Sequence, residues 1–428
     1  NHPVVTAQSQ PLAPGARIAV IGAGIVGLSA AVHLARRGRD VTLLDAAGPG
    51  EGASFGNAGL ISVDACIPVA MPGMLRNVPR WLTQPEGPLS VRPGYAARAM
   101  PWLMKWVAAG RNLDLVRRSS AAMRALHRDA YDRYRELLGS DAFLELFRQS
   151  GLVQIWSGAG IGRAEEVARE LNRAAGVETQ ELGPDDLRQI FPGIAGATRG
   201  LLFPRNGHTV SPARVTAALA DALRAEGGAF RRERVLKLIP REGGGWTLMT
   251  NLANHEADAV VVAAGSWSAR LVAPLGVALP LETERGYHLE LAQPSVELRM
   301  PIIDKTRSFA LTPMADGLRL AGTVEIAGLE APPNERRALA LRRGAEALFP
   351  GLTAAAQRMW MGFRPTLPDS VPAIGPAPGR PGLLLAVGHG HTGMIGGPAT
   401  GRLVAELLTG ERPHIPPEPY GMQRFARA

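Results

Sequence analysis

The pattern of apolar residues near the start of the chain predicts a strand, a helix and a second strand in close succession. "RIAVI" (17–21) is a short apolar run of the kind that forms a buried strand. The stretch 25–37 has helical character and is stopped by Gly38, and "VTLLD" (41–45) is predicted as the next strand. The three segments form a β-α-β unit, which is typical of a parallel sheet covered by helices.

Material of the same type returns twice later in the chain. Ser211 and Pro212 have the pattern of a helix N-cap and first helical residue, and the helix is expected to run to about Glu226. Further strands are predicted at 234–239, 245–250, 257–265 and 382–387, and a helix at 399–408.

The intervening segments have a different pattern. Pro101 is predicted to begin a short helix that ends near Gly110, and apolar positions between 123 and 137 recur every three or four residues, as in one long amphipathic helix. "YHLEL" (287–291) alternates strictly between apolar and polar residues, as a half-buried strand does. Strands are also predicted at 151–156, 308–313 and 317–322.

These patterns predict a mixed α/β and α+β protein with two interleaved domains. The first is a Rossmann-like dinucleotide-binding domain, and the second is a substrate-binding domain built on an antiparallel or mixed sheet with helices. We expect residues 17–65, 201–275 and 358–428 in the first domain, 66–200 and 276–357 in the second, and 1–16 as a leader.

Composition narrows the class of protein only slightly. The 428 residues carry a formal charge of +9, but the arginine pairs are scattered among acidic residues, so we expect no nucleic-acid partner. The single cysteine, Cys66, excludes an intrachain disulfide and a cysteine-based zinc site. No apolar run approaches the roughly 18–20 residues of a membrane-spanning helix, and the start of the chain lacks a signal-peptide pattern, which predicts a cytoplasmic protein.

The turn "GAGIVG" is the first candidate for chemistry. Gly22 permits a tight turn, Gly24 lets phosphates approach the backbone, and Gly27 lets the helix pack close to the sheet. The helix N-terminus offers free N–H groups to a pyrophosphate. Asp45 ends the second strand, where a carboxylate meets a ribose hydroxyl pair, so NAD or FAD is favoured over NADP.

Other glycine-rich segments resemble a known family. "VIGAGIVGLSAA", "SFGNAGLIS", "VVVAAGSWS", "ERGYHLEL", "GFRPTLPDSVPAIGP" and "GHGHTGMIGGPATGRLVAELL" are similar to motifs of the FAD-dependent D-amino-acid dehydrogenase and oxidase family. This family includes glycine and sarcosine oxidases and D-hydroxyproline dehydrogenase. The bacterial D-amino-acid dehydrogenase branch is the most similar, and the resemblance covers about residues 17 to 410.

The resemblance implies that FAD is the cofactor of the first domain. Asp45 is expected at the adenosine ribose, Val235 near the adenine, and residues 54–60 along the pyrophosphate and flavin. The loop 388–394 is expected to face the flavin, with the N-terminus of the following helix directed at it. The implied cofactor-binding residues are Gly22, Gly24, Ile25, Val26, Gly27, Asp45, Ala46, Ser54, Gly56, Asn57, Ala58, Gly59, Leu60, Val235, Ala263, Ala264, Gly265, Gly388, His389, Gly390, His391, Thr392, Gly393 and Met394.

The resemblance also implies oxidation of a D-amino acid to the imino acid and then the 2-oxo acid, with hydride passing from Cα to flavin N5. Arg364 is expected to bind the α-carboxylate, because a planar guanidinium suits a bidentate pair, although an ion pair with Asp369 is the structural alternative. Tyr287 is a second carboxylate contact or a core tyrosine, and either His391 or His389 lies near the substrate amine or the flavin. Lys305 is placed along the substrate wall, while His208 and His288 are given no chemical role.

Several alternatives stay open at this point. The substrate is a primary D-amino acid or a secondary or cyclic amine such as D-proline, cis-4-hydroxy-D-proline or sarcosine. The electron acceptor is a quinone or carrier, or O₂. Residues 66–110, with several Trp, Met and basic residues, either pack inside the second domain or make peripheral contact with the inner face of the cytoplasmic membrane. Two alternatives come from other functional classes: a flavoprotein that binds RNA, and an FAD-binding subunit without catalytic activity. No metal site is predicted.

Overall fold

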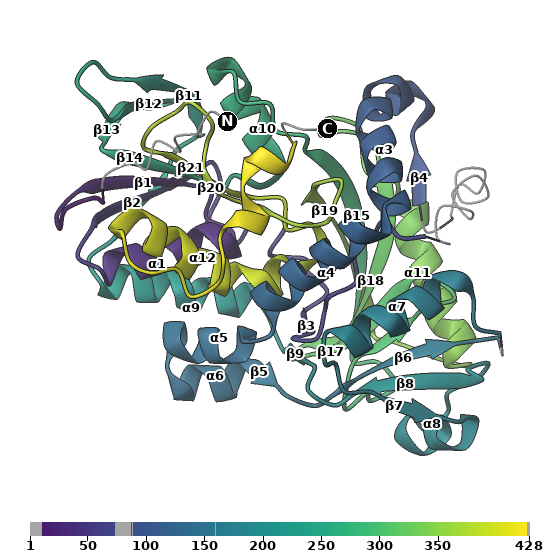
Figure 1. Cartoon of the computed structure of the whole chain (residues 1–428). Coiled ribbons are helices and arrows are strands. Elements are labelled where there is room, and N and C mark those ends of the chain that lie inside the picture. Colours follow the sequence, from purple (N-terminus) through teal and green to yellow (C-terminus); the bar gives the residue numbers. More distant parts are fainter. Residues whose placement is uncertain (1–10, 73–86, 88, 159, 426–428) are drawn as a thin grey trace.

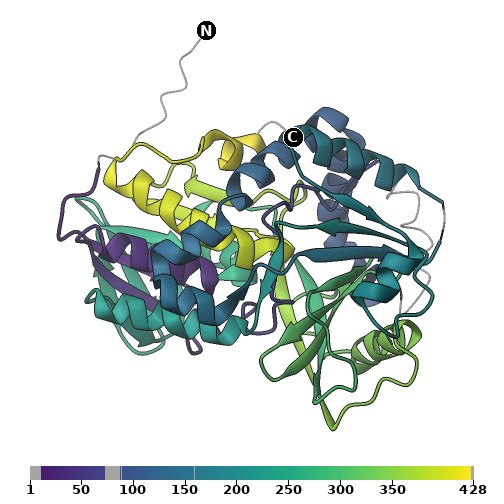
Figure 2. The same ribbon diagram turned by 90° about the horizontal axis from the view of Figure 1, so that it is seen from below.

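The computed structural model describes residues 11–72, 87, 89–158 and 160–425, and the strands within them form four sheets. Two of these sheets are large, and Figure 2 shows the two lobes built on them side by side. Figure 1 shows that segments from both ends of the chain, coloured purple and yellow, meet in one lobe. The predicted interleaving of two domains is therefore confirmed.

The first lobe contains a six-stranded sheet that is parallel except for its last strand. Its order is β10 (Ala229–Arg232), β2 (Asp40–Asp45), β1 (Arg17–Ile21), β14 (Ala259–Val262), β21 (Leu383–Val387) and antiparallel β20 (Ala373–Pro376). One face packs on α1 (Ile25–Ala35), α9 (Pro212–Ala225) and α12 (Gly393–Thr409). The other face packs on a meander of β11 (Val235–Pro240), β12 (Trp246–Thr250) and β13 (Asn254–Ala257).

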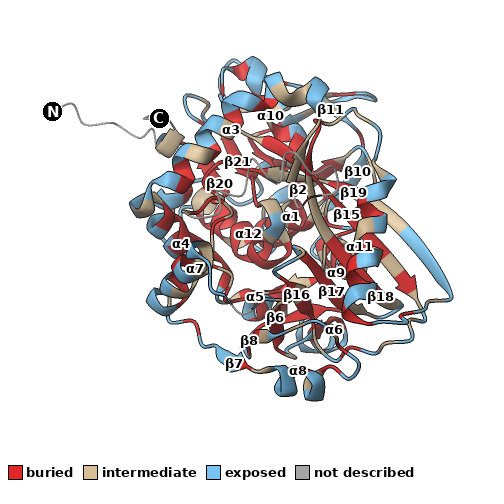
Figure 3. Ribbon diagram, turned by 90° about the vertical axis from the view of Figure 1, so that its right-hand side faces the viewer, coloured by how far each residue is buried: buried red, intermediate tan, exposed pale blue. Residues whose placement is uncertain are grey.

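Alternation along these strands explains the two cores. In β1, Ile18 and Val20 belong to the helix-facing core, whereas Ala19 and Ile21 belong to the core under the meander. Both faces are buried, so the strands are continuously apolar, as strands covered on both sides are. Figure 3 shows the buried residues in red along both large sheets, and exposed residues mainly on outer helix faces and loops.

The second lobe contains a nine-stranded mixed sheet. Its order is β19 (Ala356–Thr366), β15 (Glu282–Ala292), β18 (Gly317–Ile326), β17 (Phe309–Met314), β16 (Ile302–Asp304), β6 (Leu152–Trp156), β8 (Arg199–Phe203) and β7 (Gln180–Leu182), with β4 (Leu89–Val91) paired to β18. Helix α11 (Glu335–Leu348) packs on one face, and the remaining strands β3 (Leu60–Ile61), β9 (Gly207–Thr209) and β5 (Phe147–Arg148) form a small sheet. The other α-helices are α3 (Ala96–Arg111), α4 (Leu113–His127), α5 (Ala130–Leu138), α6 (Ser140–Leu146), α7 (Arg163–Ala174), α8 (Pro184–Ile190) and α10 (Ser268–Val272).

Two predicted domain boundaries differ from the sheet membership. The boundary at 358 falls within β19, which pairs with β15 along its whole length, so residues up to Thr366 belong to the nine-stranded sheet. Strand β8 pairs with β6 and β7 in the same sheet, although 201–203 were expected in the first domain. In the opposite direction, α4, α5 and α6 were expected in the second domain but contribute to the core that contains α1 and α12. Propensity does not specify which sheet a strand joins, because pairing depends on distant partners.

Three predicted helices also differ in extent. The single helix expected at 123–137 is two helices, α4 and α5, separated at Arg128 and Asp129. Helix α3 begins at Ala96, before Pro101, and buries Ala99 and Trp102 on both sides of the proline. Helix α12 begins six residues earlier than expected, and the added turn packs closely against α1: a Cβ on Gly397 would lie 3.2 Å from Ile25 Cγ1.

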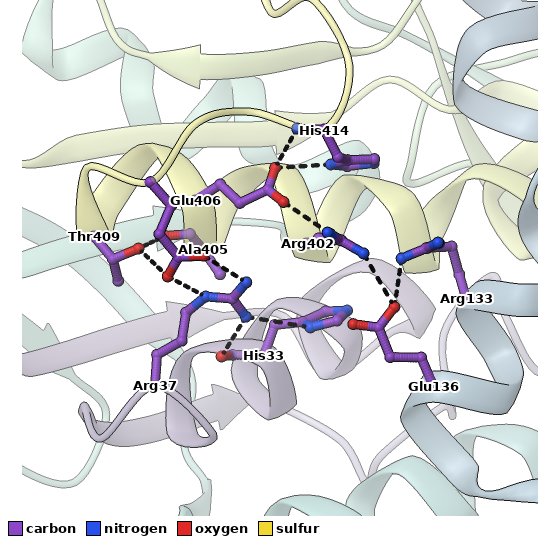
Figure 4. Close-up of polar contacts among 10 residues, drawn as sticks. His33, Arg37, Arg133, Glu136, Arg402, Ala405, Glu406, Thr409 and His414 are labelled. Atoms are coloured by element: carbon purple, nitrogen blue, oxygen red, sulfur yellow. Dashed lines mark hydrogen bonds and ion pairs between the residues drawn. The ribbon is translucent and has the colours of Figure 1, made fainter.

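A polar network ties α1, α5 and α12 together (Figure 4). The Glu406 carboxylate accepts hydrogen bonds from Arg402 Nε and from His414 Nδ1, each at 2.7 Å. Burial opposes ionisation of Glu406, but these bonds outweigh it and lower its pKa to about 2. Arg402 also pairs with Glu136 of α5 at 3.4 Å. Ion pairs and hydrogen bonds therefore stabilise the packing of the helices around the first sheet, in addition to their apolar contacts.

We predict that the protein loses stability as pH falls below about 6.5. Burial lowers the pKa of five histidines in the fold, to about 3 for His33 and His389 and about 4 for His127, His208 and His288. The unfolded chain has ordinary histidine pKa values near 6.5, so below that pH it binds protons that the folded chain does not. Each buried histidine then lowers the free energy of unfolding by up to about 1.4 kcal/mol per pH unit, down to its folded pKa.

Urea unfolding of the holoprotein between about pH 7 and pH 5.5 measures this slope. A His208→Gln variant should show a smaller slope than the wild type, by the contribution of one histidine. A free energy of unfolding that does not change over this interval would contradict the prediction.

Candidate active site

One cavity of about 1040 Å³ extends between the two large sheets. The first sheet contributes the glycine turn after β1, the end of β2, and the loop before α12. The nine-stranded sheet contributes residues of β15, β18 and β19, including Glu284, Gly286 and Arg364. A space of this size, between two domains, is suited to a large ligand together with a small one.

The glycine turn has no room for side chains. Gly22 has a φ of +104°, and a Cβ there would lie 2.2 Å from the Ala263 carbonyl oxygen. A Cβ on Gly27 would lie 1.8 Å from the Gly22 carbonyl oxygen. Asp45 Oδ2 accepts a hydrogen bond from the Ala23 backbone N–H at 2.7 Å, which holds the carboxylate beside the turn. Strand, turn, helix N-terminus and acid thus have the arrangement that cradles a dinucleotide.

All the predicted cofactor-binding residues line this cavity except Gly27, Gly59 and Gly388. These three glycines lie outside the lining, where their lack of a Cβ fixes the path of the backbone. Gly59 and Gly388 have φ values of +76° and +93°, and a Cβ on Gly388 would lie 2.5 Å from Leu367 Cδ1.

The loop 54–58 is held from the nine-stranded sheet by residues that the sequence analysis did not assign to the site. His288 Nδ1 donates to the Gly56 carbonyl at 2.9 Å, and Arg319 Nη1 donates to the Asn57 carbonyl at 2.7 Å. The Trp360 ring fills the place of a side chain at Gly56, where a Cβ would lie 2.0 Å from Trp360 Cε3. His288 was predicted to have no chemical role, and its position behind the loop gives it a positioning role.

Arg364 lies at the cavity wall in a position that requires glycine on the next strand. A Cβ on Gly286 would lie 2.2 Å from the Arg364 Cζ atom, so the guanidinium rests on bare backbone. Its Nη1 donates to the Thr323 carbonyl at 3.0 Å. The alternative pairing with Asp369 is wrong, because Asp369 Oδ2 accepts from Arg424 Nε at 2.7 Å. The Arg364 side chain is half-buried, and the protein around it lowers the pKa of its guanidinium by desolvation.

Glu284 is the functional candidate that the sequence analysis missed. It lies directly opposite Arg364 in the β15–β19 ladder, and its Oε2 accepts from His391 Nε2 at 2.8 Å. Burial opposes its ionisation, but His391 and Arg364 outweigh that effect and lower the pKa of Glu284. The period of two along β15, which places Glu284 on the same face as Gly286, was the available signal. The bridge between Thr366 and His389 holds the histidine loop at the end of the Arg364 strand.

The two other predicted contacts have different outcomes. The Tyr287 side chain packs in the core under α11, and its hydroxyl donates to Glu325 Oε2 at 2.6 Å and accepts from the Asn334 N–H at 2.9 Å. These two bonds give the hydroxyl a structural role, while Tyr287 itself is one of the residues that line the cavity. His389 is buried with Nε2 2.8 Å from Thr400 Oγ1, while His391 faces the cavity.

The segment 66–110 contributes aromatic wall to the cavity. Trp102 and Trp106 are buried and stacked at 6.4 Å, and Trp102 Nε1 donates to the Thr366 carbonyl at 3.2 Å. Of the two alternatives for this segment, packing inside the protein is therefore the one observed for these two tryptophans. Arg76 and Arg80 lie outside the described residues, and the membrane contact stays a prediction that rests on Arg98, Met100, Met104 and Lys105, which are exposed. No helix in the described part of the chain is long and apolar enough to cross a membrane.

Comparison with known proteins identifies the family. The model of a family described as FAD dependent oxidoreductase matches residues 17–407. The chain belongs to this family of FAD-dependent oxidoreductases.

Its sequence relatives in this family cover nearly the whole chain. It is 38% identical to a D-amino-acid oxidase of Bradyrhizobium diazoefficiens, over 96% of this chain and 99% of the relative. It is 32% identical to a D-amino acid dehydrogenase of Rhizorhabdus wittichii, over 96% of this chain and all of the relative.

Solved structures share the fold of this flavoenzyme. Glycine oxidase from Geobacillus kaustophilus superposes with a TM-score of 0.71 at 22% identity, over 96% of this chain and 99% of the other. Iminodiacetate oxidase from Chelativorans sp. BNC1 superposes with a TM-score of 0.72 at 23% identity, over 95% and 98%. The expected fold class and FAD as cofactor are both confirmed.

The structure of this FAD-dependent oxidoreductase fits its cofactor. Gly22 and Gly27 have no Cβ, which leaves space for the pyrophosphate at the turn. The N-termini of α1 and α12 both open on the cavity, and neither is capped by the side chain of its own N-cap residue. Ser54, which also lines the cavity, accepts a hydrogen bond from the Ile25 N–H at 3.0 Å. No group of three or more metal-ligating side chains occurs among the described residues.

We predict that Gly27→Ala weakens FAD binding. The new methyl group would lie 1.8 Å from the Gly22 carbonyl oxygen, so the turn and the helix must move apart. Overpacking of this kind costs about 1–3 kcal/mol, which corresponds to roughly 5- to 150-fold weaker binding. Visible flavin absorbance relative to protein absorbance measures the effect.

Gly94→Ala is the matched control, because nothing lies within 4 Å of a Cβ at Gly94. Equal FAD retention in the two variants would contradict the assignment of the turn.

Proposed function

We propose that this flavoenzyme oxidises a D-amino acid to the imino acid, which water converts to the 2-oxo acid and ammonia. The observation that carries the proposal is the set of three ionisable side chains at one end of the cavity: Arg364, Glu284 and His391. Relatives at 38% and 32% identity are named as a D-amino-acid oxidase and a D-amino acid dehydrogenase, and this supports the substrate class.

Arg364 binds the α-carboxylate of the substrate. Among the described residues its guanidinium makes one hydrogen bond, to Thr323 on β18, which leaves further N–H groups for a bidentate pair. The guanidinium lies in a partly dehydrated wall, where a charged partner is held more strongly than in water. The carboxylate thereby fixes the orientation of Cα in the cavity.

Glu284 and His391 bind and take up the proton of the substrate amine. Loss of hydride from Cα requires a neutral amine, whereas a free amino acid carries an ammonium group. His391 Nε2 donates to Glu284, so the neutral ring keeps Nδ1 as its acceptor. Glu284 stabilises the imidazolium that forms when Nδ1 accepts the proton. Bound FAD supplies the two-electron acceptor for the hydride.

An anaerobic experiment tests the reaction class. We expect one or more D-amino acids to bleach the visible flavin band of the holoenzyme, while the L-enantiomers do not. Sarcosine, D-proline and cis-4-hydroxy-D-proline belong in the panel, because they represent the secondary and cyclic amines. Bleaching by these amines alone would contradict the primary D-amino acid as substrate.

Admitting air to the bleached enzyme tests the electron acceptor. We propose a quinone or carrier, so the band should stay bleached in air and return when a soluble quinone is added. Rapid return in air alone would contradict this acceptor and assign the role to O₂.

Replacing Arg364 tests the carboxylate anchor. Arg364→Ala should lower kcat/KM by roughly 30-fold or more, because removing one partner of a buried charged pair costs about 2 kcal/mol or more. Arg358→Ala is the matched control, since Arg358 is exposed on the same face of β19. Equal kinetic constants for Arg364→Ala and the wild type would remove Arg364 from the site.

A further inference from the structure

Lys305 lines the same cavity, and it lies on a turn that several hydrogen bonds hold in place. The turn joins β16 to β17, and the buried Asp304 Oδ1 accepts from the N–H groups of Thr306 and Arg307, both at 2.9 Å. Asp304 Oδ2 pairs with Arg307 Nη1 at 2.7 Å, and the Lys305 N–H donates to Ile155 on β6 at 2.9 Å. A lysine on such a turn starts from a fixed backbone position, as ligand-binding side chains do.

The Lys305 ammonium has no protein counter-ion in the described part of the chain. It faces the space of the cavity, and the surrounding protein lowers its pKa. The acid whose charge acts on it most, Glu165, is already bound by Arg199 at 2.6 and 2.7 Å and by Arg169 at 3.0 Å. Lys305 is exposed to the space of the cavity rather than buried against other side chains, so its ammonium is free to pair with an anion that enters the cavity.

The distance from Lys305 to Arg364 suits a short ligand with two anionic ends. Arg364 starts on β19, but its guanidinium crosses β15 and reaches the Thr323 carbonyl on β18. Between β18 and the end of β16, where Lys305 begins, there are two strand spacings, or about 10 Å. Two cationic side chains that start this close together can both contact one ligand only if that ligand is short.

The charges of this end of the cavity match those of an acidic amino acid. Arg364 takes the α-carboxylate, and the Glu284–His391 pair takes the amine. Lys305 adds a further positive side chain to the lining of the cavity. An amide or methyl side chain would leave its ammonium without a counter-ion, and a basic side chain would be repelled.

We propose that the substrate is a D-amino acid with a carboxylate side chain, aspartate or glutamate, and that Lys305 binds that carboxylate. The assignment rests on the proposed function and names its substrate class. Lys305 is a specificity-determining residue in this assignment, and the bond broken in the reaction stays at Cα.

Kinetics of the holoenzyme test the assignment with matched substrates. D-aspartate and D-glutamate are compared with D-asparagine and D-glutamine, which have the same shape without the charge. Lys305→Gln should lower kcat/KM for the acidic substrate by roughly 10- to 150-fold, mainly through KM, because a hydrogen bond to a charged group is lost. The amide substrate should change by less than about threefold.

Lys237→Gln is the control, because Lys237 is exposed on β11 and the chain has only three lysines. Flavin absorbance of each variant shows that the cofactor site is intact. The assignment is overturned if the wild type uses the amides as well as the acids, or if Lys305→Gln lowers both classes equally.

A binding titration separates this proposal from the proposed function. Succinate and malonate should perturb the visible flavin spectrum at lower concentrations than butyrate and propionate, and Lys305→Gln should remove that preference. If no D-amino acid bleaches the flavin, the proposed function fails, whereas a dicarboxylate preference that depends on Lys305 still supports the anion site. Equal binding of mono- and dicarboxylates by the wild type overturns the role of Lys305.

Discussion

The shape of the cavity depends on glycines in both of its walls, because a Cβ atom at these positions would collide with neighbouring atoms. On the dinucleotide side, Gly22 and Gly27 bring β1, α1 and the end of β14 within contact distances that no side chain permits. On the other side, Gly286 and Gly56 give their side-chain space to Arg364 and Trp360. The two sheets can therefore enclose one continuous space and still place a guanidinium and an indole at its surface.

Charge at the substrate end is arranged by the sheet rather than by local sequence. Glu284 and Arg364 are direct neighbours across the β15–β19 ladder, yet the Glu284 carboxylate is bonded to His391 from the other domain. The guanidinium thus keeps donors for a ligand, and the carboxylate keeps the histidine oriented. Burial strengthens each of these interactions, because the surrounding medium screens them less than water does.

The same sheet stabilises the cofactor side of the cavity. His288 and Arg319 donate to carbonyls of the loop 54–58, so the position of that loop depends on strands more than two hundred residues away. Burial keeps His288 neutral at ordinary pH, which suits a single directed hydrogen bond to a carbonyl. The positions of substrate and cofactor are thus set by one rigid element.

The sequence alone determined the features that depend on short spacing. The β-α-β unit, the glycine turn, the acid that ends the second strand, and the capped helix at Ser211 follow from residues close in the chain, and all occur as expected. The resemblance to family motifs further predicted FAD as the cofactor and Arg364 as the residue that binds the substrate carboxylate.

Tertiary structure alone decided which side chains meet. The Glu284–His391 pair spans 107 residues, and the partner of the Tyr287 hydroxyl, Glu325, comes from another strand. Strand pairing moved 358–366 into the second sheet, and packing against α1 extended α12. Periodicity tells which face a residue occupies, whereas its partner comes from distant segments, and no local pattern encodes that distance.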